Sequence, residues 1–370
     1  MIKIDLITGF LGSGKTTFIR EYAKYLMQKG EKICIIENDY GAVNIDMVLL
    51  QDLYGDNCNL EMIVGGDGKE AHRRRFRTKL ISMGMSGYDR VIIEPSGIYD
   101  VDEFFDVLYD EPLDRWYEIG SVISIVDVNT VKALVGELPD ADFAEPVYGV
   151  GNIKSDKDDG NDDRDISRYV FMSEIAGAGK IVLSKLPIED CNLNNGSKVG
   201  SEEVVKTTIR GDINSIVDGI NKILADFGLG GEKPWFALEK DIIAKPFSDF
   251  SEEDFEAIEN CGYRHASYVK IPVEDQQYNP LFYFDVEMPK EKLSEIADGL
   301  FKDDKAGHII RIKGFVKTSE DEQVRINATE KGIEIAPVVS SRNVVIIIGE
   351  NLNKEYINEV FKDYCSQVSL

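Results

Sequence analysis

Residues 9–17 read Gly9-Phe-Leu-Gly-Ser-Gly-Lys-Thr-Thr17 and fit the pattern G-x-x-x-x-G-K-[ST]. A short apolar run, Lys3–Thr8, precedes this motif, and an amphipathic stretch, Thr16–Lys29, follows it. A strand that leads through a glycine-rich turn into a helix is the context in which the motif binds phosphate groups. The sequence therefore predicts a phosphate-binding loop and a fold built around it.

The residue types in this loop suit a polyphosphate. Glycines let the backbone wrap closely, so that successive N–H groups point into one concavity, and the helix N-terminus adds its positive end there. The Lys15 ammonium reaches the β- and γ-phosphates, and the Thr16 hydroxyl serves as a ligand for Mg²⁺. We predict that a nucleoside triphosphate contacts Gly9, Gly12, Ser13, Gly14, Lys15, Thr16 and Thr17.

The first half of the chain alternates short runs rich in Ile and Val with longer amphipathic stretches. This alternation is typical of a parallel sheet covered by helices, whose strands are buried on both faces. The strands predicted after the first one are 32–37, 90–94, 121–127 and 180–183. The predicted fold class is α/β, a P-loop NTPase domain with a mainly parallel sheet.

The pattern changes twice later in the chain. Residues 154–165 contain no apolar side chain, so we predict a flexible acidic loop at about 150–167. Because Pro234 and Pro246 punctuate the chain, we predict a first domain at 1–240, a linker at 241–262 and a smaller α+β domain at 263–370. The predicted strands of the second domain are 267–273, 282–286, 308–316, 323–328, 332–335 and 343–348, and its predicted helices are 289–301 and 354–364.

The chain of 370 residues carries 67 acidic and 42 basic side chains, a formal net charge of -25. A field of that sign repels nucleic acid and anionic membranes, so we expect neither as a partner. The five cysteines are scattered, which argues against a disulfide framework. The N-terminal residues read as a strand rather than a signal peptide, and apolar runs such as 344–348 are too short to cross a bilayer. We therefore expect a cytoplasmic protein.

Five segments together carry a family resemblance. They are residues 1–17, Ile36-Glu-Asn-Asp-Tyr-Gly41 with Asp46, Val91-Ile-Ile-Glu-Pro-Ser-Gly97, Arg311-Ile-Lys-Gly-Phe315 and Ile348-Gly-Glu-Asn-Leu352. The combination resembles the CobW family of P-loop GTPases, relatives of the hydrogenase and urease nickel-insertion GTPases. The resemblance implies Mg²⁺ and GTP as cofactors and a slow GTPase that acts as a switch or chaperone. The implied client is a metalloenzyme or corrinoid protein that is assembled or activated.

Three residues outside the loop are predicted to lie near the phosphates or Mg²⁺. Glu94 ends a buried strand that faces the phosphate loop, where P-loop proteins place the acid that steadies Mg²⁺ or its water; the alternative is an ordinary strand-end carboxylate. Asp39 follows the second strand and approaches Mg²⁺ when its loop closes, or else forms a turn. The N–H of Gly97 is expected to meet the γ-phosphate. The predicted catalytic residues are Lys15 and Glu94, and the predicted Mg²⁺ ligands are Thr16, Asp39 and Glu94.

The C-x-C-C metal motif of the family is missing from this sequence. The corresponding stretch is Val64-Gly-Gly-Asp-Gly-Lys-Glu70, which contains no cysteine. Thiolates are soft ligands that suit Zn²⁺, Ni²⁺ or Co²⁺. Asp67, Glu70 and His72 are a poorer set of ligands, so we favour a solvated loop over a transition-metal site here.

The base-recognition motif N-K-x-D of the family is also altered, because this chain has Ser184-Lys-Leu-Pro187. Lys185 can still cover the purine ring, and we predict that Ser184 and Lys185 contact the nucleotide. The carboxylate that distinguishes guanine from adenine is absent, which leaves a hydrogen-bonding group of the base unpaired at a cost of about 1–3 kcal/mol. Selectivity for GTP should therefore be weaker than usual unless another residue compensates, and Asp190 lies nearby in sequence. We therefore expect GTP as the nucleotide, with ATP as an alternative.

Two other functions use the same loop. The first is a small-molecule kinase in which Glu94 acts as the base toward an acceptor, and the second is a nucleotide-binding scaffold that does not hydrolyse. No arginine finger can be assigned from the sequence, so we expect slow turnover until a partner protein accelerates it.

Overall fold

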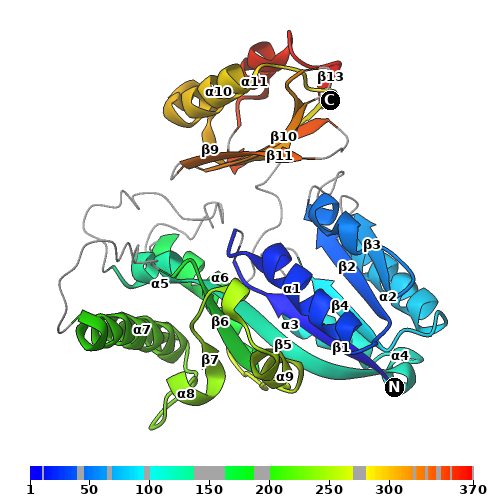
Figure 1. The fold of residues 1–370 in the computed structure, drawn as a ribbon, viewed down its shortest axis with the longest axis vertical. Helices are drawn as coiled ribbons and strands as arrows, with labels where there is room; N and C mark the ends of the chain where they lie inside the picture. The colour runs from blue at the N-terminus through cyan, green and yellow to red at the C-terminus, as the bar shows by residue number, and fades with distance from the viewer. Residues whose placement is uncertain are drawn as a thin grey trace. The chain divides into compact units, whose positions relative to one another are not determined.

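The computed structural model describes residues 1–10, 12–39, 46–64, 69–95, 101–136, 163–186, 201–269, 281–319, 322–329, 332–338, 343–350 and 352–368. The described chain divides into two compact units, which are considered separately (Figure 1). The first comprises described residues within Met1–Phe143 and Arg164–Ile271, and the second comprises those within Pro272–Leu370.

The first unit is built on a seven-stranded sheet in the order β3-β2-β4-β1-β5-β6-β7, with every neighbouring pair parallel. Its strands are β1 (Ile2–Thr8), β2 (Ile33–Asp39), β3 (Cys58–Val64), β4 (Arg90–Glu94), β5 (Tyr117–Asp127), β6 (Lys180–Ser184) and β7 (Ile242–Ile243). Its helices are α1 (Lys15–Gln28), η1 (Asp46–Leu53), α2 (Lys69–Gly84), α3 (Val101–Leu108), α4 (Leu113–Trp116), α5 (Val128–Val135), α6 (Asp163–Ala176), α7 (Ser201–Asp226), α8 (Leu238–Asp241), η2 (Phe247–Asp249) and α9 (Glu252–Glu259). The predicted α/β class with a parallel sheet is confirmed.

The strands that the sequence predicts are those with uninterrupted apolar runs. β1, β4, β5 and β6 bury most of their residues on both faces, as strands covered by helices do. The sequence analysis missed β3 and β7. β3 alternates apolar residues with Asn59 and Glu61 at an edge of the sheet, and β7 has only two residues, too few for a recognisable pattern.

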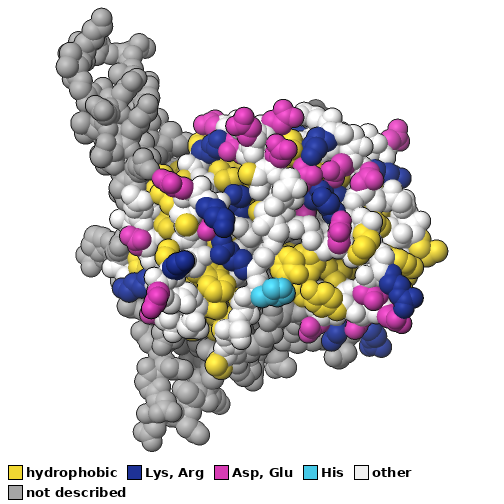
Figure 2. All heavy atoms as spheres, turned by 90° about the horizontal axis from the view of Figure 1, so that it is seen from below, with side chains coloured by type: hydrophobic (Ala, Val, Ile, Leu, Met, Phe, Trp, Pro, Cys, Tyr) yellow, Lys and Arg dark blue, Asp and Glu magenta, His cyan; other side chains and the backbone are white. Residues whose placement is uncertain are grey.

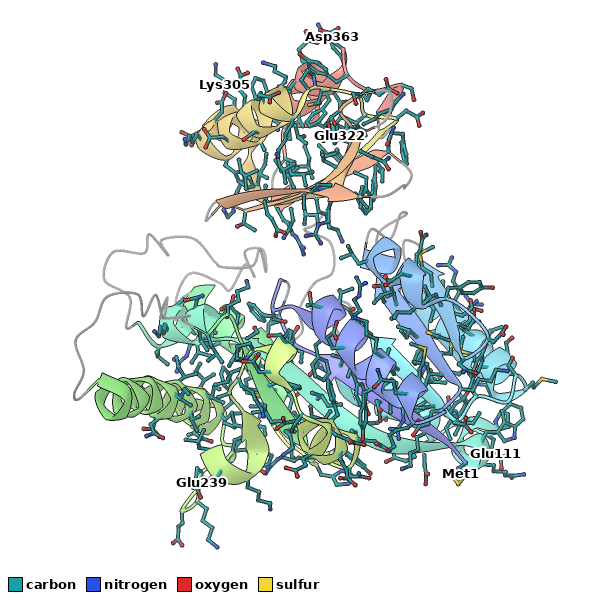
Figure 3. All side chains as sticks on the ribbon, in the orientation of Figure 1. Met1, Glu111, Glu239, Lys305, Glu322 and Asp363 are labelled. Atoms are coloured by element: carbon teal, nitrogen blue, oxygen red, sulfur yellow. The ribbon has the colours of Figure 1, made fainter. Side chains whose placement is uncertain are left out.

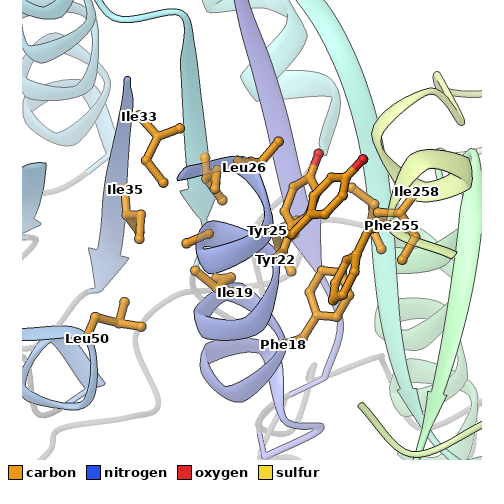
Figure 4. Close-up of a cluster of buried hydrophobic side chains, with 14 of the residues drawn as sticks. Phe18, Ile19, Tyr22, Tyr25, Leu26, Ile33, Ile35, Leu50, Phe255 and Ile258 are labelled. Carbon is orange, nitrogen blue, oxygen red and sulfur yellow. The ribbon is translucent and has the colours of Figure 1, made fainter. Parts of the chain in front are cut away.

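Helix α1 buries one side against the sheet and another against α9. Phe18, Tyr22 and Tyr25 line the second side, and Phe255 of α9 stacks on Tyr25 with a centroid distance of 5.0 Å (Figure 4). The segment 241–262, predicted to be a linker, therefore contributes β7 and α9 to the first unit. Pro246 stands directly before the short helix η2, and the aromatic side chains that follow it pack on α1.

A buried ionic network centres on the side chain of Arg90, the first residue of β4, which is 1% exposed. Its guanidinium donates to carboxylate oxygens of Asp5 (2.7 Å), Glu31 (2.9 Å) and Glu259 (3.0 Å). Asp5 also accepts from the Tyr22 hydroxyl at 2.8 Å. Because each group has a partner, the network ties β1, β4, α1 and α9 together without leaving a buried charge uncompensated.

The second unit contains a six-stranded antiparallel sheet in the order β11-β10-β9-β12-β8-β13. Its strands are β8 (Leu281–Phe284), β9 (His308–Lys317), β10 (Gln323–Thr329), β11 (Gly332–Val338), β12 (Val344–Glu350) and β13 (Gln367–Val368), and its helices are α10 (Lys290–Lys302), η4 (Asp304–Ala306) and α11 (Lys354–Phe361). α10 and α11 lie on one side of the sheet, the side on which Figure 3 labels Lys305 and Asp363. The predicted smaller α+β unit is confirmed.

Several sequence predictions fall wholly or partly outside the described residues. The acidic loop predicted at about 150–167 lies mostly in 137–162, which are not described, and α6 begins at Asp163 within its last part. The strand predicted at 267–273 is not regular structure over 267–269, and its remainder is not described. Among the described residues, no helix combines the length and apolar character needed to span a membrane. On the face shown in Figure 2, acidic side chains are interspersed with Lys and Arg.

Candidate nucleotide site

The glycine-rich loop joins the end of β1 to the start of α1. Gly9 has φ +128°, and a Cβ placed on it would lie 2.2 Å from the carbonyl oxygen of Ile125 on β5. Gly14, with φ +100°, is the residue from which α1 starts. Both positions require glycine, because a side chain would be strained at Gly14 and would also collide with the sheet at Gly9. The predicted strand–turn–helix geometry is present.

The Lys15 side chain folds back onto the backbone of the phosphate loop. Its ammonium donates to the carbonyl oxygens of Gly9 (2.6 Å) and Phe10 (3.4 Å), and the residue is only 6% exposed. A buried ammonium at the N-terminus of α1 adds its positive charge to that end of the helix dipole. The arrangement is suited to an anionic group at the loop.

Thr16, at the start of α1, lies beside Glu94, at the end of β4, although the two are 78 positions apart in sequence. The Thr16 hydroxyl lies 3.1 Å from one carboxylate oxygen of Glu94 and 3.3 Å from the other. Glu37 on β2 pairs in register with Glu94 on β4, which places a second acid at this end of the sheet. Hydroxyl and carboxylate oxygens are the ligand types that Mg²⁺ prefers, so the residues present fit that ion.

Two further predicted site residues lie wholly or partly outside the described structure. Asp39 is the last residue of β2 and pairs with Val64, but its side chain is outside the described structure. Gly97 also lies outside the described residues, as do Pro187 and Asp190. Their predicted roles stay predictions.

The end of β6 carries the altered base motif. Ser184 pairs with Asp127 of β5, so the two strands end side by side. The Lys185 ammonium forms an ion pair with the Asp127 carboxylate at 2.8 Å, and Lys185 has a left-handed backbone with φ +52°. Asp127 also accepts from the backbone N–H of Asn129 and so caps α5. These contacts hold Lys185 at the edge of the sheet where the phosphate loop also lies.

A transition-metal site formed by Asp67, Glu70 and His72 is not seen among the described residues. Asp67 is not described, only the backbone of Glu70 is described, and His72 is buried in α2. Within the described ranges, no group of three or more His, Cys, Asp or Glu side chains is placed to hold a metal ion.

Sequence reasoning missed a buried acid behind the loop. Glu174 on α6 is 3% exposed, and within the described structure neither carboxylate oxygen has a hydrogen-bond partner. Its backbone carbonyl accepts from the Thr8 hydroxyl at 2.7 Å, and Phe171 on the same helix contacts Phe10 of the loop. Burial raises the pKa of Glu174 well above its usual range, and the Lys15 charge lowers it by a smaller amount. An acid on an amphipathic helix gives no sequence signal.

We expect the Glu174→Gln variant to be more stable than the wild type at neutral and alkaline pH. A pKa raised by folding adds stability below the unfolded value of about 4.3, and this stability is lost as pH rises toward the folded value. The gain at about pH 8 should be about 1 kcal/mol or more, because an unpartnered buried carboxylate is removed. Urea denaturation at about pH 5 and about pH 8 measures it.

The matched control is Glu118→Gln on β5, which changes an exposed acid. Its free energy of unfolding should follow the pH dependence of the wild type. An advantage of Glu174→Gln that does not grow with pH would contradict the assignment of a raised pKa.

Family comparisons identify the class of protein. The family model described as "CobW/HypB/UreG, nucleotide-binding domain" matches residues 3–198, more than half of the chain. The model "Cobalamin synthesis protein cobW C-terminal domain" matches residues 281–365. The chain therefore belongs to the CobW/HypB/UreG family of P-loop proteins, and it has the second domain of CobW. The resemblance noted from the sequence is confirmed.

Individual relatives match over shorter stretches. Zinc chaperone YeiR of Escherichia coli is 32% identical over 128 residues, which are 34% of this chain and 38% of the relative. Zinc chaperone YjiA of the same organism is 31% identical over 134 residues, 34% of this chain and 40% of the relative. These matches span less than two thirds of either relative. Among solved structures, Zn(II)-bound YjiA GTPase from E. coli matches with a TM-score of 0.36 and 15% identity over 98% of each chain.

Proposed function

We propose that this protein is a Mg²⁺-dependent GTP-binding protein and slow GTPase. Its proposed role is that of a switch or chaperone in the assembly or activation of a metalloenzyme or corrinoid protein. The observation that carries the proposal is the phosphate loop with buried Lys15 and the neighbouring Thr16–Glu94 contact. Family membership and the names of relatives, which are zinc chaperones, support the client part.

The proposed nucleotide contacts are those predicted from the sequence. The phosphates lie on Gly9, Gly12, Ser13, Gly14, Lys15, Thr16 and Thr17, with the Gly97 N–H at the γ-phosphate, and the base lies near Ser184 and Lys185. Thr16, Asp39 and Glu94 are the proposed ligands of Mg²⁺ or of its water. Mg²⁺, when bound, neutralises charge on the β- and γ-phosphate oxygens.

The chemistry proposed for the site is in-line attack of a water molecule on the γ-phosphate. The bond from the water oxygen to the γ-phosphorus forms while the bond from that phosphorus to the β–γ bridging oxygen breaks, and GDP and inorganic phosphate leave. Lys15 moves from the loop carbonyls to the phosphates and compensates the negative charge that develops there. Glu94 orients the attacking water or the Mg²⁺ ion through its carboxylate. A partner protein presented by the second unit is proposed to supply the remaining acceleration.

The proposed nucleotide preference is GTP, with ATP accepted. Lys185, held by Asp127, supplies a cover for a purine ring of either kind. The sequence from Ser184 to Pro187 has no carboxylate to read the guanine edge. The proposal assigns no transition-metal cargo site, because the stretch from Val64 to Glu70 has no thiolate.

The Glu94→Gln variant tests the mechanism. We expect GTP hydrolysis to fall by about 100-fold or more, because the neutral amide cannot hold the water as a carboxylate does. Nucleotide binding should persist, because the phosphate loop is unchanged. Phosphate release under single-turnover conditions measures the rate of hydrolysis, and titration with a fluorescent GTP analogue measures nucleotide binding.

The same assay separates the alternative functions. Diphosphate production that depends on an added small molecule would favour a kinase, with Glu94 as the base toward the acceptor. Triphosphate binding without hydrolysis, even with partner proteins present, would favour a non-hydrolysing scaffold. Hydrolysis by Glu94→Gln at the wild-type rate would contradict the proposed role of this carboxylate.

A further inference from the structure

The segment after β7 reaches the same end of the sheet as the phosphate loop. β7 pairs in parallel with β6, with Val182 opposite Ile243. Strands that run in parallel end at the same edge, and ligands of open α/β sheets bind outside that edge. Residues that follow Ile243 therefore leave the sheet beside Lys185, the residue that covers the base in the proposed function.

Phe247 begins η2 in this segment, and its side chain lies beside the loop at Gly14. Two of its ring atoms lie 3.5 Å and 3.8 Å from the position that a Cβ on Gly14 would occupy. The ring meets Phe18 of α1 edge to face, at a centroid distance of 5.8 Å, and Phe250 at 5.9 Å. The side chain is nevertheless only half-buried, whereas Phe18 is fully buried. Part of an aromatic ring is thus exposed next to the phosphate loop.

The neighbouring contacts hold this ring in place. Phe18 and Phe250 contact it edge to face, and Pro246 restricts the backbone that precedes it. A ring that is already fixed loses little conformational entropy when a ligand stacks on it.

We infer that Phe247 is a nucleotide-positioning residue whose exposed ring contacts the purine by stacking. The inference rests on the proposed function and deepens it. Stacking uses the face of the base, which guanine and adenine share, and so gives affinity without distinguishing them. This form of recognition agrees with the altered motif at Ser184–Pro187, in which the carboxylate that selects guanine is absent. Phe247 and Lys185 together replace selection by hydrogen bonds with contact to the ring.

Binding of three ligands to the Phe247→Leu variant of the full-length chain tests the inference. The ligands are GTP, ATP and inorganic tripolyphosphate, each with Mg²⁺. We expect the dissociation constants of GTP and ATP to rise together by about tenfold or more, the loss expected when a base loses an aromatic partner. Tripolyphosphate has no base, so its dissociation constant should stay within about twofold of the wild type. Isothermal titration calorimetry measures all three.

Two further variants separate stacking from a structural effect. Phe255→Leu removes a ring from the same aromatic cluster that packs on Tyr25, and it should leave all three constants near those of the wild type. Phe247→Tyr keeps the ring and should bind both nucleotides as the wild type does. An equal loss of tripolyphosphate binding in Phe247→Leu would overturn the inference, because the ring would then only shape the loop. Unchanged GTP and ATP binding in that variant would also overturn it.

Ligand binding by the wild type distinguishes a failure of the proposed function from a failure of the inference about Phe247. A wild-type chain that binds neither nucleotide nor tripolyphosphate would sink the proposed function together with the inference. A wild-type chain that binds GTP, with Phe247→Leu indistinguishable from it, would overturn the inference alone.

Discussion

The Lys15→Ala variant is expected to lose most of its affinity for GTP and ATP, and hydrolysis with it. The ammonium is the single charged donor within the motif at 9–17, in a chain whose net charge of -25 opposes an anionic ligand. Removing one partner of a buried charge pair typically costs 2–5 kcal/mol, so the dissociation constant should rise by about 30-fold to several thousand-fold. Titration with a fluorescent nucleotide analogue measures the loss.

Lys24→Ala provides a matched control on the same helix. Lys24 pairs with Glu21 on the surface of α1, at 2.8 Å, and both side chains are partly exposed. Its removal should leave nucleotide binding unchanged, because the side chain lies outside the loop. Unaltered hydrolysis by Lys15→Ala would exclude the mechanism proposed here.

The second large effect is expected for Arg90→Leu, in the folding of the first unit. The variant leaves Asp5, Glu31 and Glu259 without their shared guanidinium, and Asp5 is fully buried. Breaking a buried ionic network by removing one partner typically costs 3–5 kcal/mol. The free energy of unfolding, measured by urea denaturation, should fall by about that amount.

The pH dependence of this loss has a definite sign. Burial raises the pKa of Asp5, and the Arg90 guanidinium opposes that effect. Without Arg90 the pKa of Asp5 rises further, so its ionisation at higher pH destabilises the variant more than the wild type. The loss should therefore be smaller in acid than at neutral pH.

Arg115→Leu is the control for this variant. Arg115 pairs with Glu111 on the periphery of the first unit, and both side chains are mostly exposed (Figure 3). Removing an exposed ion pair changes stability by less than about 1 kcal/mol. A comparable loss in both variants would contradict the role assigned to the buried network.

Local patterns were sufficient for the phosphate loop and for the strands that lead into it. The glycine spacing from Gly9 to Gly14 requires backbone angles that few other residues adopt, and the Ile- and Val-rich runs require burial on both faces. Glu94 could be located at a strand end as well, and in the structure its carboxylate lies beside the Thr16 hydroxyl.

Boundaries were less predictable where long-range packing overrides local signals. Pro234 and Pro246 suggested a linker, yet β7 gains its hydrogen bonds from β6 and α9 gains its burial from α1. Neither element has a strong pattern of its own, so their membership in the first unit depends on residues more than fifty positions away.

By itself the sequence determined the α/β class, the phosphate loop, the family and the altered base motif, because each depends on residues close together along the chain. Only the tertiary structure decided that Phe247 meets Gly14, that Glu174 lies buried behind the loop and that Arg90 joins three carboxylates. The physical reason is that parallel strands bring distant segments to one edge of a sheet, and side-chain partners there follow from packing rather than from spacing in sequence.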